Sequence, residues 1–252
     1  MFKTIPNPNL SYGSVPMDTD HDLCKNIAPP LDVIQSGSLI ILCGASRSGK
    51  TTQLINLISK TGTKNGYKQS FRKCFHKIIL CSPSIHTIKK DVFKIPDSQK
   101  YTDFNECMYD IESHIDASKA EEERDDEKKF NLLILDDVAS SLRANRGNEI
   151  LLTSLLQNRR HKNLTTILVV QKWTNLPTGV RCNADVVFLC GRPKTISEQD
   201  AITNDVLPIA KKSTLQLFDY IYDKKYVTLM IDMTLKKSDK FRYFKNFQEI
   251  IF

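Results

Sequence analysis

The octapeptide at residues 44–51, GASRSGKT, constrains the fold of this 252-residue chain more than any other feature. It fits the pattern G-x-x-x-x-G-K-[S/T] in full, and it has the context that this pattern requires. The apolar run 39–43 precedes it, and Leu54, Leu57 and Ile58 follow at helical spacing. The sequence therefore predicts a buried strand, a phosphate-binding loop and a helix, in that order. This is the nucleotide-binding element of a P-loop nucleoside triphosphatase.

The chemistry of the loop follows from its residue types. Glycines let the backbone curl so that N–H groups point at phosphate oxygens, and the helix N-terminus adds a positive partial charge. Lys50 would reach the β- and γ-phosphates, and Thr51 would place its hydroxyl on Mg²⁺. The nucleotide contacts are expected from Gly44, Ala45, Ser46, Arg47, Ser48, Gly49, Lys50, Thr51 and Thr52. The later strands are not followed by the guanine-reading pattern Asn-Lys-x-Asp or Thr-Lys-x-Asp, so we expect ATP.

Four further apolar runs have the length of buried strands, and helical or polar segments separate them. They span residues 77–81, 132–135, 165–170 and 185–190. Alternation of this kind predicts an α/β fold with a mostly parallel central sheet and helices on both faces. In such sheets, ligands bind at the carboxyl ends of the strands.

Polar side chains stand at the carboxyl ends of two of these strands. Asp136 and Asp137 follow the third strand, and Gln171 follows the fourth. Asp136 is placed to hold Mg²⁺ opposite Thr51, and Asp137 to accept a proton from the attacking water. Gln171 would lie near the γ-phosphate and orient water. The alternatives are an acidic pair that caps a turn and a solvated strand end.

Other segments carry weaker patterns. A helix is expected over 148–159, with Ile150, Leu151 and Leu155 on its apolar face. Residues 226–232 read as an additional edge strand. The aromatic and basic residues at 241–245 read as an amphipathic terminal helix, with contact to DNA as the alternative. We expect three regions: an extended lead-in at 1–30, the P-loop domain at 31–235 and a basic, aromatic tail at 236–252.

Composition narrows the class of protein. The apolar fraction is 40% and no apolar run is long enough to span a bilayer, so we expect no integral membrane association. The N-terminal residues lack a secretory signal, which predicts a reducing cytosol or nucleus. The seven cysteines show no Cys-x-x-Cys spacing, so free buried thiols are expected rather than a zinc site or disulfides. The net charge of +7 favours polyanionic partners.

Together these motifs resemble a known family. The segments are the phosphate-binding loop, the strand 78–81 running into Ser-Pro-Ser, the strand with the acidic pair at 132–137, the run Asn-Arg-Arg-His at 158–161 and the strand ending at Gln171. They are similar to the viral genome-packaging ATPases of the FtsK–HerA superfamily, which occur in poxviruses, other large DNA viruses and virophages. The resemblance covers residues 39–191.

The resemblance implies an ATP-driven motor that assembles as a homo-oligomeric ring and translocates double-stranded DNA into a preformed capsid. It implies capsid or vertex proteins as partners, and the host cytoplasm or nucleus as the place of action. Arg160, or failing it Arg159, resembles the arginine finger that such a subunit supplies to its neighbour. The alternative for these arginines is a solvated basic turn at a helix C-terminus.

Three rival functions share the same motifs. A nucleotide or nucleoside kinase would need an acceptor pocket and a basic lid, which the arginine run could imitate. A helicase-like ATPase is mechanistically close to a packaging motor. A nucleotide-bound scaffold on DNA or capsid protein would need no useful hydrolysis.

Overall fold

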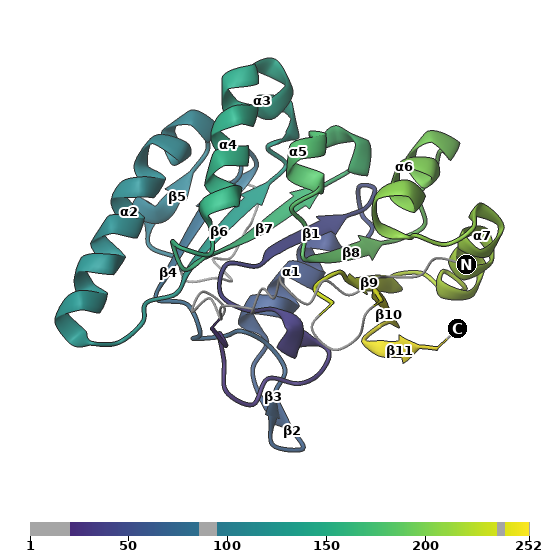
Figure 1. Cartoon of the computed structure of the whole chain (residues 1–252), viewed down its shortest axis with the longest axis horizontal. Coiled ribbons are helices and arrows are strands. Elements are labelled where there is room, and N and C mark those ends of the chain that lie inside the picture. The colour runs from purple at the N-terminus through teal and green to yellow at the C-terminus, as the bar shows by residue number, and fades with distance from the viewer. Residues whose placement is uncertain (1–20, 86–94, 236–239, 252) are drawn as a thin grey trace, which may run out of the picture.

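A nine-stranded sheet forms the centre of the molecule in the computed structural model, which describes residues 21–85, 95–235 and 240–251. Its strand order is β11-β10-β9-β8-β1-β7-β6-β4-β5 (Figure 1). The strands of this sheet are β1 (Leu39–Cys43), β4 (Lys77–Cys81), β5 (Lys100–Tyr101), β6 (Asn131–Asp136), β7 (Leu164–Val170), β8 (Val186–Cys190), β9 (Thr228–Asp232), β10 (Arg242–Lys245) and β11 (Gln248–Ile250). The six strands from β8 to β5 run parallel, and β9, β10 and β11 are antiparallel to their neighbours.

Helices cover both faces of the sheet, as the sequence predicts. They are α1 (Lys50–Ser59), α2 (Phe104–Asp125), α3 (Ala139–Ala144), α4 (Arg146–Asn158), α5 (Thr178–Arg181), α6 (Ile196–Val206) and α7 (Lys211–Ile221), with 3-10 turns at η1 (Leu31–Val33), η3 (Asp97–Gln99) and η4 (Trp173–Asn175). Successive strand residues point to opposite faces, and both faces are covered, which is why the central strands β1, β4, β6, β7 and β8 read as largely apolar runs. The α/β fold with a mostly parallel sheet is therefore confirmed.

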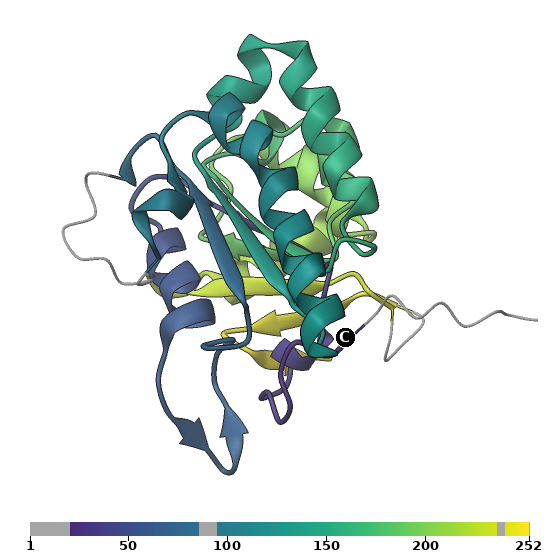
Figure 2. The same ribbon diagram turned by 90° about the vertical axis from the view of Figure 1, so that its left-hand side faces the viewer.

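The alternation in β1 shows how the two layers form. Ile41 packs in a core with side chains of α2 to α7, whereas Ile40 and Leu42 pack in a second core with Leu54 and Leu57 of α1. Figure 2 shows α1 and α2 on opposite sides of the strands. Every residue of β1 is buried. The strand that leads into the phosphate-binding loop is thus fixed from both faces.

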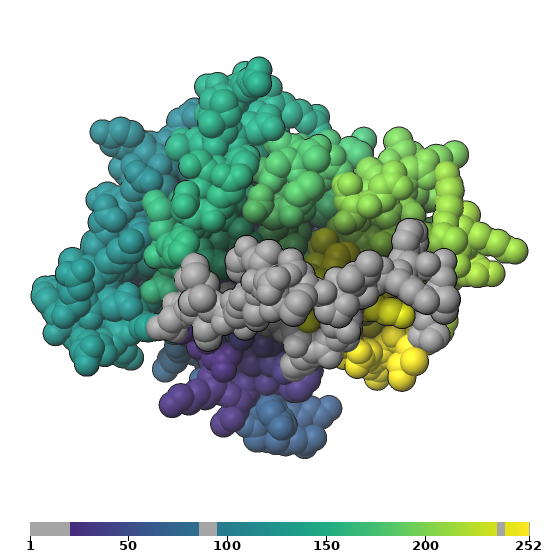
Figure 3. Space-filling model, viewed as in Figure 1, coloured from purple at the N-terminus to yellow at the C-terminus, as the bar shows by residue number. Residues whose placement is uncertain are grey.

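Apolar side chains from the segment 21–34 pack in the second core. Leu23 and Ile27 are buried there, and Ala28 N–H donates to Lys68 O at 2.9 Å. Lys68 lies in a hairpin of β2 (Thr63–Lys64) and β3 (Tyr67–Lys68) that extends from the body of the molecule (Figure 2). In the space-filling view, the purple N-terminal residues and the blue hairpin lie together (Figure 3).

The cysteines correct one expectation. Cys24 and Cys74 form a disulfide with a Cα–Cα distance of 5.8 Å, so the expectation of free thiols throughout was wrong for this pair. It links two segments 50 residues apart that both pack on the second core, a proximity that spacing alone does not show. Four free cysteines, Cys43, Cys81, Cys107 and Cys190, are buried, and Cys182 is exposed.

Three details of the secondary structure also differ from the predictions. Residues 228–232 form β9, which is an interior strand because β10 and β11 continue the sheet beyond it. Residues 242–245 form β10 rather than a terminal helix. Helix α4 is present, but Ile150 and Leu151 are exposed and its buried face carries Leu152, Leu155 and Leu156. Among the described residues, no helix combines the length and apolar character needed to cross a membrane.

Candidate nucleotide-binding site

The phosphate-binding loop leaves β1 at Cys43 and enters α1 at Lys50. Gly44 N–H donates to Val170 O of β7 at 3.1 Å, and a Cβ on Gly44 would lie 2.3 Å from Cys190 O of β8. The first loop residue therefore fits between two strand ends only as glycine. Gly49 caps α1 at φ +98°, a conformation that favours glycine, and it offers no side chain to the helix. The first N–H groups of α1 are thus left for an anion.

Lys50 is bound to its own loop. Its Nζ donates to Gly44 O at 2.7 Å and to Ala45 O at 3.0 Å. The ammonium group therefore stands over the loop whose N–H groups would hold the phosphates. The Ser48 hydroxyl is buried and has no hydrogen-bond partner among the described residues. A cation, an open helix N-terminus and an unused hydroxyl in one loop fit the phosphates of a nucleotide.

Asp136 is the last residue of β6 and is paired in register with Val169 of β7. The Ser82 hydroxyl donates to its Oδ2 at 3.1 Å. Burial raises the pKa of the Asp136 carboxyl above its usual value, while the Ser82 hydrogen bond and the charge of Lys50 act in the opposite direction. Burial disfavours the negative charge of the Asp136 carboxylate, and the positive charge of Lys50 stabilises it.

The two side chains that the sequence predicts as metal ligands, Thr51 and Asp136, carry donor atoms that suit Mg²⁺. The Thr51 hydroxyl and the Asp136 carboxylate supply oxygen atoms, and Mg²⁺ takes one or two protein oxygens with phosphate and water completing its shell. No group of three or more His, Cys, Asp and Glu side chains that would hold a metal by itself occurs among the described residues.

Asp137 and Gln171 meet at the same edge of the sheet. The backbone of Asp137 is left-handed, at φ +57°, and its N–H donates to Val169 O at 3.1 Å. Gln171 Nε2 donates to Asp137 Oδ2 at 3.2 Å. Because β7 lies between β1 and β6, Gln171 stands between the phosphate-binding loop and the acidic pair. The structure thus brings together the side chains that the sequence assigned to three different strands.

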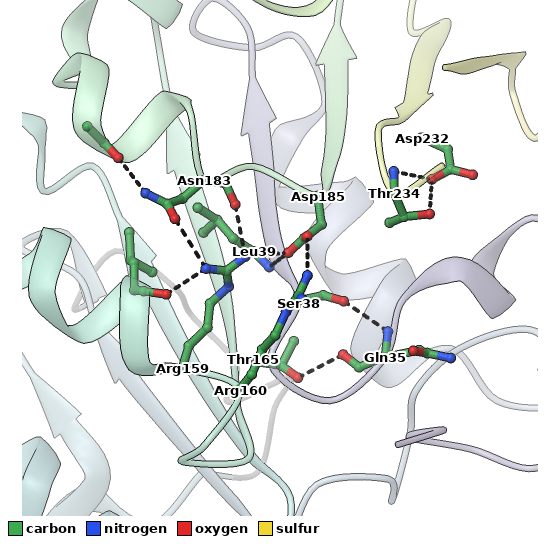
Figure 4. A network of polar contacts seen from close by, with 12 residues as sticks. Gln35, Ser38, Leu39, Arg159, Arg160, Thr165, Asn183, Asp185, Asp232 and Thr234 are labelled. Atoms are coloured by element: carbon green, nitrogen blue, oxygen red, sulfur yellow. Dashed lines mark hydrogen bonds and ion pairs between the residues drawn. The ribbon is translucent and has the colours of Figure 1, made fainter. Parts of the chain in front are cut away.

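Arg159 and Arg160 lie at the opposite edge. Arg159 is buried, and its guanidinium donates to Asp185 Oδ2 at 2.8 Å and to Asn183 O at 3.0 Å (Figure 4). Arg160 Nη2 donates to Asp185 Oδ1 at 3.3 Å, and its side chain is 45% exposed. Asp185 also accepts from Leu39 N–H at 2.7 Å. These contacts join the amino ends of β1, β7 and β8, far along the strands from the phosphate-binding loop of the same chain.

A cavity of about 590 Å³ opens beside the loop. It is lined by Arg47, Ser48, Gly49, Lys50, Thr51, Thr52, Gln53, Asn56, Tyr226 and Thr228. Its size lies in the range of small-molecule sites. Tyr226 and Thr228 were not among the site residues predicted from the sequence. Neither belongs to a recognisable nucleotide-binding motif.

Solved structures share this fold at low sequence identity. The DNA-packaging ATPase B204 from Sulfolobus Turreted Icosahedral Virus is 14% identical, with a TM-score of 0.50 over 82% of this chain and 96% of that one. The genome packaging NTPase B204 from Sulfolobus turreted icosahedral virus 2, in complex with AMPPCP, is 16% identical, with a TM-score of 0.51 over 82% of this chain and 96% of that one. The cytoplasmic domain of the Type VII secretion ATPase EccC from Thermomonospora curvata is 13% identical, with a TM-score of 0.50 over 85% of this chain and 26% of that one.

These likenesses show a shared P-loop fold. No individually curated protein is similar enough in sequence to count as a match. The family model described as Poxvirus A32 protein matches residues 33–244, which include β1 to β9, most of β10 and every predicted site residue. The predicted resemblance to a poxvirus family is thereby confirmed. This chain belongs to the poxvirus A32 protein family.

Proposed function

We propose that this chain is an ATP-hydrolysing motor that translocates double-stranded DNA into a preformed capsid. The observation that carries the proposal is the meeting of the phosphate-binding loop, Asp136 and the Asp137–Gln171 pair at one edge of the sheet. Membership of the poxvirus A32 family supports it, as does the fold shared with a protein described as a DNA-packaging ATPase. The net charge of +7 suits a polyanionic partner.

Each side chain at this edge has a distinct task in the proposed reaction. Lys50 would leave the carbonyls of its own loop and neutralise the γ-phosphate. Thr51 and Asp136 would hold Mg²⁺. Bound Mg²⁺ would neutralise the charge that develops on the phosphate oxygens. Gln171 holds Oδ2 of Asp137, which leaves Oδ1 to accept the proton of the attacking water.

Asp137→Asn is expected to lower the ATP hydrolysis rate by roughly 100-fold or more, because it removes the proton acceptor and keeps the shape of the side chain. Asparagine tolerates the left-handed backbone found at this position, so the turn should survive. ATP binding should stay close to wild type. Single-turnover hydrolysis and equilibrium binding, measured on the same preparation, check both statements.

The neighbouring variant Asp136→Asn is the matched comparison. It should raise the Mg²⁺ concentration needed for half-maximal activity, since Asp136 is assigned to the metal. If both variants showed the same Mg²⁺ dependence and the same rate, the division of labour between the two aspartates would be wrong.

Double-stranded DNA is expected to stimulate ATP hydrolysis, and added salt should reduce that stimulation. A protein that neutralises several phosphates releases counterions on binding, so its affinity falls as a power of the salt concentration. Steady-state ATPase rates with and without double-stranded DNA, over a salt series from about 50 to 200 mM, measure the effect.

The rival functions predict other results in that assay. A rate that DNA does not change, with phosphate transferred to a nucleotide or nucleoside acceptor, would replace the motor by a kinase. Nucleotide binding without turnover would replace it by a scaffold. Strand separation on a forked duplex would indicate a helicase.

The remaining parts of the proposal concern assembly. We propose a homo-oligomeric ring in which Arg160 serves the active site of the neighbouring subunit, with capsid or vertex proteins as docking partners. The motor would act where virions assemble, in the host cytoplasm or nucleus. The partial exposure of Arg160 supports its assignment over Arg159, which is buried against Asp185.

A further inference from the structure

The antiparallel strand β9 brings a loop to the nucleotide edge of the sheet. β9 pairs with β8 in reverse, with Thr228 opposite Cys190. The residues just before β9 therefore stand beside the carboxyl end of β8, next to the strand that feeds the phosphate-binding loop. Residues 222–227 form this connection from α7, and no motif in them indicates a nearby ligand.

Both ends of the connection are fixed. The Tyr222 hydroxyl donates to Leu189 O at 3.0 Å, and the Tyr222 side chain is half-buried. Thr228 N–H donates to Asn246 Oδ1 at 3.0 Å, and Asn246 N–H donates to Thr228 O at 3.0 Å. Val227 is buried between these points. The loop thus has a defined position relative to β8 and β10.

Tyr226 stands out in this loop. Its side chain is 74% exposed, although its neighbour Val227 is buried. Its backbone has φ +62°, a conformation that a bulky residue rarely adopts and that costs free energy. Its ring lies against the turn of the phosphate-binding loop: a Cβ on Gly49 would be 3.7 Å from Tyr226 Cδ1.

The ring also forms a wall of the cavity beside the loop. The same cavity is lined by residues of α1, including Thr52 and Asn56, which are exposed. A nucleotide whose phosphates occupy residues 44–51 has to extend its nucleoside into adjoining space. This cavity of about 590 Å³ adjoins the loop and offers an exposed aromatic face.

We infer that Tyr226 is the platform on which the nucleobase stacks. The inference rests on the proposed function, because it assumes that the loop binds a nucleoside triphosphate. Stacking on an aromatic ring uses the face of a base rather than its edge, so it strengthens binding without selecting one base. Selection among bases would fall to polar groups on the other walls, such as Gln53, Asn56 and Thr228.

The test compares ATP, supplied as a non-hydrolysable analogue so that binding is measured without turnover, with inorganic tripolyphosphate, which carries the phosphates but no base. Both are titrated into wild type and Tyr226→Ala by isothermal calorimetry in the presence of Mg²⁺. Tyr226→Ala should weaken ATP binding by roughly tenfold or more, as expected for the loss of one stacked base, and leave tripolyphosphate binding unchanged. Tyr226→Phe keeps the ring and should bind ATP like wild type.

Tyr109→Ala is the matched control, since Tyr109 is 87% exposed on α2 and lies outside the cavity. It should change neither affinity. Thermal unfolding of every variant shows that the fold is retained. Equal weakening of ATP and tripolyphosphate by Tyr226→Ala, or no weakening of ATP, would overturn the stacking role while nucleotide binding itself stood. Wild type that bound neither compound would instead overturn the proposed function, and this inference with it.

Discussion

Lys50→Ala is expected to abolish ATP hydrolysis and to weaken nucleotide binding. The ammonium group is the cation that stands over the phosphate-binding loop, held at 2.7 Å from Gly44 O and 3.0 Å from Ala45 O. Neutralising the charge that spreads over the γ-phosphate is where such sites gain most of their rate. Initial rates of phosphate release at saturating ATP and Mg²⁺ give the effect.

Lys60→Ala is the control for this substitution, because Lys60 is the C-cap at the far end of the same helix. This substitution removes the lysine at the end of the helix and leaves the phosphate-binding loop intact. The rate of ATP hydrolysis should therefore stay near that of wild type. Activity in Lys50→Ala equal to that of the control would show that the loop does not act on a nucleoside triphosphate.

Arg160→Ala is expected to lower the hydrolysis rate by about a thousandfold, as the loss of an arginine supplied in trans does in other nucleoside triphosphatases. Arg160 lies at the amino edge of the sheet beside Asp185, at the opposite end of the strands from the loop of its own chain. The γ-phosphate of a neighbouring subunit is the target that we propose. A guanidinium group suits this role because it is always charged and its planar fork matches phosphate oxygens.

Mixing two inactive variants tests the trans role directly. In rings that contain both Lys50→Ala and Arg160→Ala subunits, some interfaces pair an intact loop with an intact arginine. Activity should therefore reappear above that of either variant alone. Absence of recovery in demonstrably mixed rings would leave Arg160 as part of a structural turn.

Two other side chains in this turn serve as comparisons. Lys162, which pairs with Glu112 on the surface, should tolerate alanine without loss of activity. Arg159→Ala should instead lower the stability of the fold, because it removes the partner of a buried carboxylate and leaves Asp185 poorly paired. An unfolding measurement on Arg159→Ala thus separates a structural arginine from a catalytic one.

The sequence predicts best those elements whose residue pattern is compatible with only one kind of secondary structure. The strand 39–43 is buried on both faces and 77–81 is buried over its last three residues; both read as apolar runs, and their predicted bounds agree with the structure. Asp136, Asp137 and Gln171 could be placed at one edge because parallel strands share their carboxyl ends. That Gln171 hydrogen-bonds Asp137 depends on the strand order, which the sequence does not state.

The errors have physical causes as well. Helix α4 offers two apolar stripes, and spacing alone does not tell which faces the sheet, so the exposed Ile150 and Leu151 were assigned to the core. Residues 242–245 form a strand because β9 provides a neighbour to pair with, which is a tertiary effect. Tyr226 escaped notice because its role depends on an antiparallel strand returning to the nucleotide edge.

The two outermost strands of the sheet have a consequence for how subunits join. In the described part of the chain, β5 has two residues and β11 has three, so neither border presents there a long row of free backbone groups to another chain. Copies of this protein would then associate through side chains rather than by continuing one sheet into the next. Subunits of the proposed ring could then change their relative angle during each round of hydrolysis. No backbone hydrogen bonds between subunits would have to break and form again.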